Sequence, residues 1–266
     1  MVTPTAAAYA ATVGIVDLFL SLLYPPRCPS CEREIAATGR PALCGGCRGQ
    51  LTPIPAACPL CGEPGSGHAC GRCAVAPPPF ARARACFLYR DDDLSSRLLL
   101  RWKYRGDHVI GSSLASILRE HRTPHAECYD VIVPVPLHAA RLARRGFNQA
   151  AILARAIARP QERVLVDALR REGQATTQTT LGRHARADNV RDIFAVRSAR
   201  HLGGRSVLLV DDVVTTGATV RSCSSVLLAA GARRVEVWSL ARTPRRISAT
   251  HAAHHRSPPP TPRARP

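Results

Sequence analysis

The sequence predicts an α/β protein with a mostly parallel sheet, preceded by a small cysteine-rich module. Two observations lead to this fold class. Between residues 81 and 242, short apolar runs typical of buried strands alternate with segments of helical periodicity. Upstream of them, eight of the eleven cysteines fall into four Cys-x-x-Cys pairs. A chain of 266 residues has room for both units, since single domains commonly span ~100 to 200 residues.

The chain divides into five expected segments. The apolar stretch from Ala6 to Tyr24 is not typical of a signal peptide or membrane anchor, since it lacks a basic start, carries Asp17 and precedes two prolines. We interpret it as an amphipathic helix that packs on the protein itself, with peripheral membrane contact as the alternative. The expected segments are an apolar N-terminal helix (1–24), a cysteine module (25–76), a proline linker (77–80), an α/β domain (81–243) and a disordered basic tail (244–266).

The cysteine module has the spacing of metal sites rather than of a disulfide framework. Each pair can turn as a knuckle that presents two thiolates to one tetrahedral ion, and two knuckles complete a Cys₄ zinc site. Because short loops cost little to close, we expect two sequential zinc ribbons, although an interleaved pairing is also open. Iron–sulfur clusters or redox-active cysteine pairs fit the four repeated pairs less well than zinc does. Zinc could either fold the module or serve nucleic-acid binding. The expected zinc ligands are Cys28, Cys31, Cys44, Cys47, Cys58, Cys61, Cys70 and Cys73.

The composition points to anionic partners. The formal net charge is +18, which favours phosphates, nucleic acid or acidic lipid headgroups as ligands. Nearly all of the positive charge is arginine, and the only lysine is Lys103. Arginine suits bidentate phosphate contacts, but a GC-rich coding sequence gives the same bias. The cysteine usage fits a reducing compartment, so we predict a cytoplasmic protein without a transmembrane segment.

Apolar periodicity places the elements of the α/β domain in order. A strand is expected over 81–89 and a helix over 93–104. The run over 129–136 predicts a buried strand that ends in prolines, which cannot extend a hydrogen-bonded ladder. The remaining expected elements are helices over 111–121, 181–191 and 220–230, a helix that ends at 158, and strands over 164–169, 207–210 and 233–240.

The strongest signal follows the strand at 207–210. Two adjacent carboxylates, Asp211 and Asp212, stand where this strand is expected to end, and a hydroxyl-rich loop leads into the next helix. Free backbone N–H groups and the helix dipole make such a loop an anion site. Carboxylates beside a bound phosphate can accept hydrogen bonds from vicinal hydroxyls, so the pattern predicts a ribose phosphate, with an ordinary turn and solvated carboxylates as the alternative. The loop residues are Thr215, Thr216, Gly217, Ala218 and Thr219.

A second phosphate site is expected after the strand at 129–136. Three arginines, Arg141, Arg144 and Arg145, follow this strand, and a glycine allows a turn. We predict a pyrophosphate-binding loop there, with a solvated basic loop as the alternative. The polar stretch 170–180 has no apolar period and predicts a mobile lid that closes over a charged substrate. All these loops leave the carboxyl edge of the predicted sheet, where α/β proteins bind ligands.

The segment 207–220 resembles the 5-phosphoribosyl-1-pyrophosphate (PRPP) motif of type I phosphoribosyltransferases, and it matches that pattern without a gap. The resemblance implies that Asp211 and Asp212 hold the ribose hydroxyls while the loop 215–219 wraps the 5-phosphate. It also implies Mg²⁺ as a cofactor that binds together with PRPP. The segment contains neither the Gly-Lys-Ser/Thr of a Walker loop nor a Gly-x-Gly-x-x-Gly dinucleotide turn.

The order of motifs over residues 8–243 resembles the ComF family, which joins a double zinc ribbon to a type I phosphoribosyltransferase domain. The cysteine pairs come first, followed by Leu100–Gly106, Val133–Pro136, Arg145–Gln149 and the PRPP motif. The resemblance implies a pyrophosphate loop and a flexible loop. The pyrophosphate-loop residues would be Lys103, His138, Arg141, Arg145, Gly146 and Asn148, and the flexible-loop residues Thr177, Gln178 and Arg186.

This resemblance implies a bacterial cytoplasmic protein of natural transformation, with single-stranded DNA and the competence machinery as partners. The chain departs from the family pattern at Asp192–Phe194, where a small residue before the Phe is expected, and in its Pro-rich tail. Two functional hypotheses follow. The first is a phosphoribosyltransferase that binds PRPP with Mg²⁺ and transfers or recognises ribose 5-phosphate. The second is a non-catalytic protein that handles single-stranded DNA and uses the transferase fold and zinc ribbons as a scaffold.

Overall fold

The computed structural model describes residues 25–35, 43–65, 67–122, 129–165, 167–172 and 194–245. Several sequence predictions lie outside these residues. They are the N-terminal helix, the helix at 181–191, the tail from 246 onward, and Thr177, Gln178 and Arg186 of the flexible loop. In the part of the chain that the structure describes, no helix combines the length and apolar character that a membrane crossing requires.

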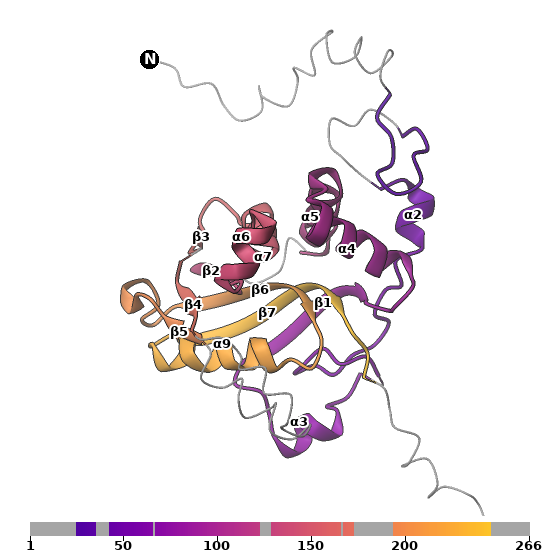
Figure 1. The fold of residues 1–266 in the computed structure, drawn as a ribbon. Coiled ribbons are helices and arrows are strands. Elements are labelled where there is room, and N and C mark those ends of the chain that lie inside the picture. The colour runs from indigo at the N-terminus through magenta and orange to yellow at the C-terminus, as the bar shows by residue number, and fades with distance from the viewer. Residues whose placement is uncertain are drawn as a thin grey trace, which may run out of the picture.

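A five-stranded sheet forms the centre of the fold, and all its neighbouring strands run parallel. The apolar runs 207–210 and 131–133 are completely buried in two of its three inner strands, because helices cover both faces of the sheet (Figure 1). The predicted parallel α/β architecture is therefore confirmed. The strand order is β1 (Arg82–Leu88), β7 (Arg234–Arg242), β6 (Ser206–Val214), β2 (Val131–Pro134) and β3 (Arg163–Val164).

Helices α4 to α7 lie on one face of the sheet, and α9 lies on the other (Figure 1). Asp93 and Asp107 cap α4 and α5, since each carboxylate accepts a hydrogen bond from the backbone N–H three residues further on. Gly111 lets α5 approach α4, because a Cβ at this position would overlap the indole of Trp102. The helices are α4 (Leu94–Arg105), α5 (His108–His121), α6 (Ala139–Arg145), α7 (Gln149–Ile157) and α9 (Ala218–Ala229).

The structure corrects several predicted boundaries, two of which bear on the site. Helix α9 begins at Ala218 rather than at residue 220, so Ala218 and Thr219 of the predicted loop belong to its first turn. Strand β6 does not end before the acidic pair but continues to Val214, since Asp211 still pairs with Ser239 of β7 and Val214 pairs with Arg242. Helix α5 begins at residue 108 rather than 111, at the cap described above. The acidic pair therefore belongs to the strand itself, which fixes its backbone.

Three further predictions around the sheet were wrong or incomplete. The expected strand over 164–169 does not exist as one element, because residue 164 ends β3 while β4 (Leu169–Arg171) belongs to a second sheet. There β4 pairs antiparallel with β5 (Phe194–Val196), a strand that no apolar run predicted. The basic stretch after β2 contains the short helix α6, which has no buried residue and hence no apolar period.

The cysteine module closes the outer edge of β1. The backbone N–H of Ala83 donates to the carbonyl of Leu60, and that of Leu88 donates to the carbonyl of Thr52, both at 2.8 Å. An uncovered edge strand would present unpaired N–H and C=O groups to solvent. The module also contributes two short helices, α2 (Gly45–Gly49) and α3 (Gly71–Val75).

A buried charge cluster lies near the amino-terminal end of β7. Glu236 is completely buried, and one of its carboxylate oxygens accepts hydrogen bonds from Arg82 Nε at 2.6 Å and from Tyr129 Oη at 2.7 Å. Arg234 Nη2 lies 2.6 Å from the other oxygen. Burial, and then the hydrogen bond to Glu236, raise the pKa of Tyr129. One oxygen of this carboxylate is therefore hydrogen-bonded, and the other has the Arg234 guanidinium as an ion-pair partner.

Candidate functional site

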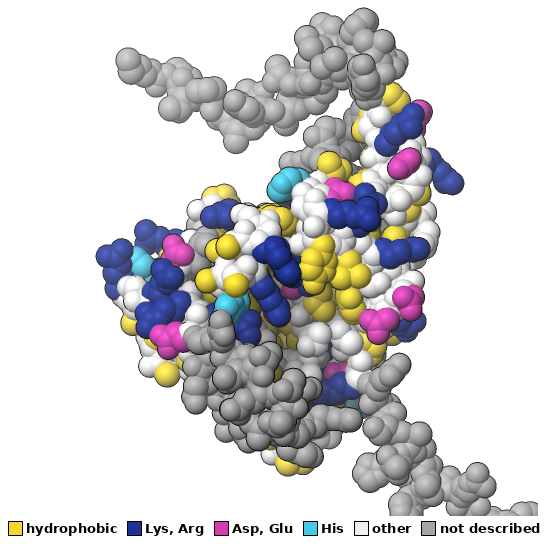
Figure 2. Space-filling view, viewed as in Figure 1, with side chains coloured by type: hydrophobic (Ala, Val, Ile, Leu, Met, Phe, Trp, Pro, Cys, Tyr) yellow, Lys and Arg dark blue, Asp and Glu magenta, His cyan; other side chains and the backbone are white. Residues whose placement is uncertain are grey.

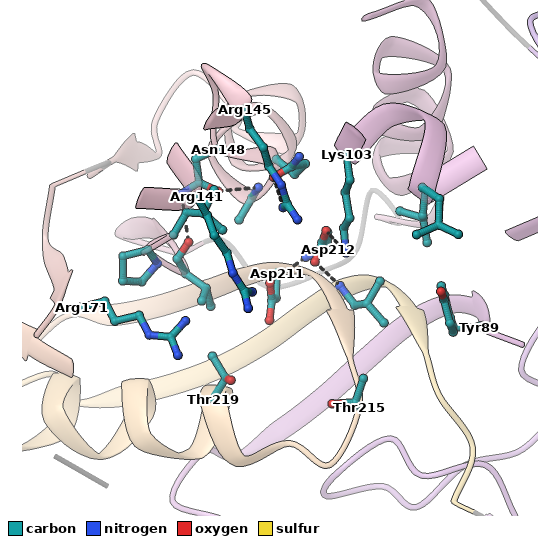
Figure 3. Close-up of a pocket in the computed structure, with 18 of the residues that line it drawn as sticks. Tyr89, Lys103, Arg141, Arg145, Asn148, Arg171, Asp211, Asp212, Thr215 and Thr219 are labelled. Atoms are coloured by element: carbon teal, nitrogen blue, oxygen red, sulfur yellow. Dashed lines mark hydrogen bonds and ion pairs between the residues drawn. The ribbon is translucent and has the colours of Figure 1, made fainter. Parts of the chain in front are cut away.

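The acidic pair lies on the floor of a cavity of about 320 Å³, at the carboxyl-terminal end of β6 (Figure 3). Lys103 reaches across from α4, and its Nζ lies 2.6 Å from Asp212 Oδ2. The backbone N–H of Asp212 donates to Asp211 Oδ1 at 2.9 Å. These contacts hold the two carboxyl groups side by side at the cavity floor.

The two carboxyl groups are electrostatically unequal. Burial, and then the negative charge of Asp212, raise the pKa of Asp211 to about 8, against smaller lowering effects of the Asp212 N–H and of Lys103. Near pH 7 the Asp211 carboxyl is therefore mostly protonated, so it can donate as well as accept a hydrogen bond. Such a pair suits a sugar diol, in which each hydroxyl both donates and accepts.

The loop after β6 supplies donors beside the acidic pair. Gly217 adopts a left-handed conformation (φ 80°) and begins α9, at little cost because it lacks a Cβ. The hydroxyl of Thr216 accepts a hydrogen bond from the N–H of Ala218 at 3.3 Å, whereas Thr215 and Thr219 line the cavity. Since glycine has no side chain with which to cap a helix, the first turn of α9 can bind an anion instead.

Arginine side chains from α6 form the opposite wall of the cavity. Arg141 and Arg145 both point from this helix toward Asp211 (Figure 3). Asn148 fixes the turn that follows, because its Nδ2 donates to the carbonyl of Val135 and its Oδ1 accepts from the first turn of α7, both at 3.0 Å. The segment between β2 and α7 therefore holds cations against the carboxylates across the cavity.

Two residues predicted for the pyrophosphate loop have local structural roles. His138 Nδ1 accepts a hydrogen bond from the N–H of Ala140 at 3.2 Å and so caps α6. Gly146 ends that helix with φ 77°. Among the described residues, neither lines the cavity. The predicted pyrophosphate-loop residues that line it are Lys103, Arg141, Arg145 and Asn148.

Tyr89, Arg171 and Phe194 also line the cavity. Arg171 falls in the stretch 170–180 that was predicted as a mobile lid, but it belongs to strand β4, and no sequence pattern pointed to Tyr89 or Phe194. The guanidinium carbon of Arg171 lies 5.6 Å from the ring centre of Phe194, and burial followed by the charge of Arg141 lowers the pKa of Arg171. The pairing of β4 with β5 brings these two side chains to the site. Tyr89 follows β1 directly, so the rule that ligands bind beyond the carboxyl ends of strands could have found it.

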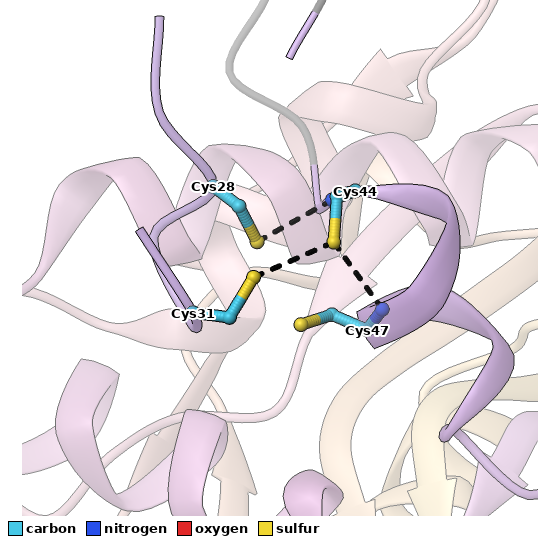
Figure 4. A group of neighbouring side chains, drawn as sticks. All are labelled: Cys28, Cys31, Cys44 and Cys47. Atoms are coloured by element: carbon cyan, nitrogen blue, oxygen red, sulfur yellow. Dashed lines mark hydrogen bonds between the residues drawn. The ribbon is translucent and has the colours of Figure 1, made fainter. Parts of the chain in front are cut away.

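The cysteines form two separate tetrads, so the sequential arrangement is confirmed. Within each tetrad the four Sγ atoms lie within 4.8 Å of one another, and Figure 4 shows the first tetrad converging on a common centre. The Sγ atoms of Cys31 and Cys44 are 3.6 Å apart, and those of Cys61 and Cys70 are 3.7 Å apart. A tetrahedral ZnS₄ site with bonds of ~2.3 Å places its sulfur atoms ~3.8 Å apart. Each tetrad therefore fits one zinc ion.

Backbone donors stabilise one thiolate in each tetrad. Burial acts to raise the pKa of Cys28, but backbone N–H groups of the two knuckles, that of Cys44 first, lower it to about 6. Burial also acts to raise the pKa of Cys58, but backbone N–H groups, mainly those of Cys61 and Cys70, lower it to about 6. Because the thiolate is the form that binds metal, this cysteine of each tetrad is ready to bind zinc at neutral pH. Burial raises the pKa of Cys47 and Cys73, so these thiols would lose their protons as the metal binds.

Comparison with known proteins finds two family matches along the chain. Residues 19–86 match the family described as double zinc ribbon domain, and residues 121–254 match the phosphoribosyl transferase domain. Competence protein F of Haemophilus influenzae is 32% identical over 233 residues, which cover 81% of this chain and 96% of that protein. Competence protein ComFC of Bacillus subtilis is 32% identical over 212 residues, covering 76% of this chain and 84% of that protein. The chain belongs to the ComF family.

A third ComF-type relative has a name that refers to DNA. The Escherichia coli protein named DNA utilization protein YhgH is 34% identical over 234 residues, which cover 84% of this chain and 99% of that protein. The predicted family, with its double zinc ribbon and phosphoribosyltransferase fold, is thus confirmed. Tyr89 and Lys103 lie between the two matched segments, so β1 and α4 complete the cavity of this ComF-family chain.

Proposed function

We propose that the cavity binds PRPP, or a closely related ribose 5-phosphate, together with Mg²⁺, and that the protein transfers or recognises the phosphoribosyl group. One observation carries the proposal. The acidic pair and hydroxyl-rich loop of β6 and α9 face the arginines of α6 across a single cavity of about 320 Å³. One site therefore contains groups that can bind a phosphate, a sugar diol and a pyrophosphate.

Each part of the ligand has a defined set of partners in this proposal. Asp211 and Asp212 hold the two ribose hydroxyls, and the first turn of α9 with Thr215 and Thr219 binds the 5-phosphate. The guanidinium groups of the α6 wall bind the pyrophosphate, since arginine makes bidentate contacts with phosphate oxygens. The oxygens of the Asp212 carboxylate, and those of Asp211 after loss of its proton, are the ligands that would hold Mg²⁺, which prefers oxygen ligands.

The chemistry requires the bond between C1 of the ribose and the pyrophosphate oxygen to break, with the electron pair leaving on the pyrophosphate. A positive charge then develops at C1, as in glycoside chemistry, before a nucleophile bonds to that carbon. The Asp212 carboxylate stabilises this charge, and the α6 arginines stabilise the leaving group. Bound Mg²⁺ would neutralise part of the pyrophosphate charge. The protein acts by positioning and electrostatics rather than by covalent catalysis.

Isothermal titration with PRPP and Mg²⁺ tests the binding step. We expect the double variant Asp211→Asn/Asp212→Asn to bind PRPP at least about 100-fold more weakly than wild type, since hydrogen bonds to charged groups contribute about 1.5 to 3 kcal/mol each. Equal heats from the two proteins would refute the assignment. Incubation with PRPP, Mg²⁺ and a panel of nucleobases, with pyrophosphate release as the readout, then tests transfer.

A second candidate function is single-stranded DNA handling, favoured by a surface next to the α6 wall. Tyr104 is 62% exposed, and the guanidinium carbons of Arg144 and Arg145 lie 5.9 and 5.1 Å from its ring centre. Figure 2 shows hydrophobic side chains beside Lys and Arg side chains on this face. Exposed aromatic rings flanked by cations stack bases and bind phosphates of single strands. The relatives named for competence and DNA utilization fit this reading.

Fluorescence anisotropy with a labelled oligonucleotide tests this surface. Affinity should fall steeply as salt rises, because binding to phosphates releases counterions. Tyr104→Ala should weaken binding by about 1 to 3 kcal/mol, the contribution of one stacked base. Val75→Ala, which alters an exposed apolar side chain on α3, serves as the matched control. Absence of measurable binding at ~50 mM salt contradicts the DNA-handling function.

A further inference from the structure

The second zinc ribbon, defined by Cys58, Cys61, Cys70 and Cys73, contacts the phosphate loop (Thr215–Thr219) directly. Arg72 lies between two of these cysteines on α3, and its Nη1 donates to the backbone carbonyl of Thr216 at 3.3 Å. Arg245 Nη2 donates to the same oxygen at 3.3 Å. Two guanidinium groups therefore hold one peptide group in the middle of the loop.

The orientation of this peptide matters for anion binding. A peptide unit is planar, and in the trans form its C=O and N–H groups point in opposite directions. Fixing the Thr216 carbonyl toward Arg72 therefore also fixes the direction of the Gly217 N–H, which points away from the zinc ribbon. Gly217 begins α9, where free N–H groups bind anions. The contact with Arg72 thus sets the direction of a backbone donor at the start of α9.

Glu63 forms a second connection between the same ribbon and the loop. Its backbone carbonyl accepts a hydrogen bond from the N–H of Cys58 at 2.8 Å, so it belongs to the knuckle. Its carboxylate accepts hydrogen bonds from Arg242 Nη2 and from the backbone N–H of Arg245, both at 2.8 Å. The side chains of Arg242 and Glu63 are only 4% and 12% exposed, and Arg242 Nη1 lies 4.0 Å from the position of a Cβ on Gly217. This buried pair packs against the start of α9.

The first zinc ribbon contacts different parts of the fold. Arg48, which directly follows Cys47 on α2, forms an ion pair with Glu120 of α5. Arg101 of α4 donates to the carbonyl of Pro29 at 2.8 Å. Figure 1 shows α2 beside α4 and α5, whereas α3 lies on the α9 side of the sheet. Two metal sites of the same chemistry therefore have different neighbours.

We propose that Arg72 and Glu63 are positioning residues for the phosphate loop, so that zinc in the second tetrad, unlike zinc in the first, supports ribose 5-phosphate binding. The inference about ligand binding rests on the proposed function, but the positioning of the loop does not. Because Arg72 stands between two expected zinc ligands, the metal fixes the helix from which it reaches the loop. Loss of that metal would release the Thr216 carbonyl without removing any group that touches the ligand.

Hydrogen–deuterium exchange of the unliganded full chain tests the positioning role. Amides of residues 215–221 should exchange about tenfold faster in Arg72→Ala and in Glu63→Gln than in wild type, because local opening becomes easier. Arg48→Ala, which removes the ion pair of the first ribbon, should leave them unchanged. Arg72→Lys keeps a cationic donor and should give an intermediate rate. Exchange at wild-type rates in both Arg72→Ala and Glu63→Gln overturns the proposal.

Calorimetry with PRPP and Mg²⁺ then tests the consequence for binding. Arg72→Ala and Glu63→Gln should bind PRPP about three- to tenfold more weakly, as expected for the loss of one partly exposed charged hydrogen bond, while Arg48→Ala should bind normally. If wild type binds PRPP and all three variants bind it equally well, the inference fails. If wild type binds no PRPP, the proposed function fails, and the exchange rates still decide the positioning role.

A matched pair of cysteine variants assigns the effect to the metal. Cys44→Ser and Cys70→Ser each alter one partly buried ligand, in the first and second tetrad respectively. Each variant should lose one bound zinc relative to wild type, measured by atomic absorption. Only Cys70→Ser should show faster exchange at 215–221. Equal acceleration in both variants overturns the difference between the two tetrads.

Discussion

Two acidic sites on neighbouring strands of one sheet have opposite surroundings. Near the amino-terminal end of β7, Glu236 is completely buried and has two arginines and a tyrosine as partners. At the carboxyl-terminal end of β6, Asp211 and Asp212 lie side by side with Lys103 next to the second of them. There the pKa of Asp211 rises to about 8, whereas the Glu236 carboxylate is matched by cations.

This difference in surroundings distinguishes a carboxylate that stabilises the fold from carboxyl groups that are placed to bind a ligand. A buried carboxylate with complete partners stabilises its surroundings, and removal of one partner leaves an uncompensated charge. Two carboxyl groups packed together disfavour each other's ionisation, which lowers the stability of the folded state but leaves oxygens available. Among the residues that line the cavity, Arg145 Nε, Gln149 Nε2 and Arg171 Nε have no hydrogen-bond partner within the described part of the protein, so the cavity retains donors for a ligand.

The largest effect should come from Glu236. Glu236→Gln removes a carboxylate from between two guanidinium groups, so we expect the free energy of unfolding to fall by about 3 kcal/mol, the lower end for buried pairs, because both arginines reach solvent. Urea denaturation followed by circular dichroism measures the loss. Glu34→Gln, in the exposed pair with Arg27, should show no measurable change. A loss below about 1 kcal/mol for Glu236→Gln would show that the cluster is not what holds this end of the sheet.

A smaller effect of opposite sign is expected at Asp211. Because its folded-state pKa is raised to about 8, the folded protein binds more protons than the unfolded chain between about pH 4 and pH 8. The contribution of this bound proton to the free energy of unfolding is fully present below about pH 4. It is lost as the pH rises toward 8. Asp211→Asn should therefore be more stable than wild type at pH 8, and the difference should shrink by about 2 kcal/mol on lowering the pH to 6.

Thermal unfolding across this pH range measures the effect, with Asp212→Asn as the companion variant. Since the Asp212 charge is the second cause of the raised pKa of Asp211, Asp212→Asn should flatten the pH dependence only in part. Parallel pH profiles for wild type and Asp211→Asn would contradict the raised pKa.

The smallest effect concerns Lys103. It lowers the pKa of Asp211 and pairs with Asp212, so Lys103→Met should shift the pH profile of wild-type stability to higher pH. It should also weaken PRPP binding about fivefold, equivalent to about 1 kcal/mol, through loss of one cation. Ribose 5-phosphate lacks the pyrophosphate and should lose less affinity. Titration calorimetry with both ligands checks this, and equal losses for both would place Lys103 away from the pyrophosphate.

Local sequence patterns were sufficient to predict secondary structure where consecutive residues of the chain are all buried. The run 207–210 is fully buried because helices cover both sheet faces, so it appears in the sequence as an unbroken apolar strand. Polar residues ended that pattern at Asp211, although the ladder with β7 continues to Val214. Helix α6 has no buried side chain and thus leaves no apolar period. Its two ends are set by the His138 cap and by Gly146, which a repeating apolar pattern does not reveal.

The site was predictable where its groups are close in sequence. The acidic pair and the loop 215–219 form one motif, and the expected arginines follow the next strand. Arg171 reaches the cavity only through the pairing of β4 with β5, which joins segments separated by more than twenty residues. The contact of Arg72 with Thr216 spans 144 positions. No local pattern encodes such contacts, since they depend on how the cysteine module packs against the finished sheet.

The cover that the cysteine module places over β1 has a consequence outside the binding site. Thr52 and Leu60 occupy the outer edge of this strand through backbone hydrogen bonds, and zinc ribbons of this size depend on their metal to fold. We therefore expect that zinc starvation exposes the outer edge of β1, which could then pair with strands of other molecules. In a cell short of zinc, the protein would then aggregate through this strand edge, and aggregation would remove its function before a change in ligand affinity could do so.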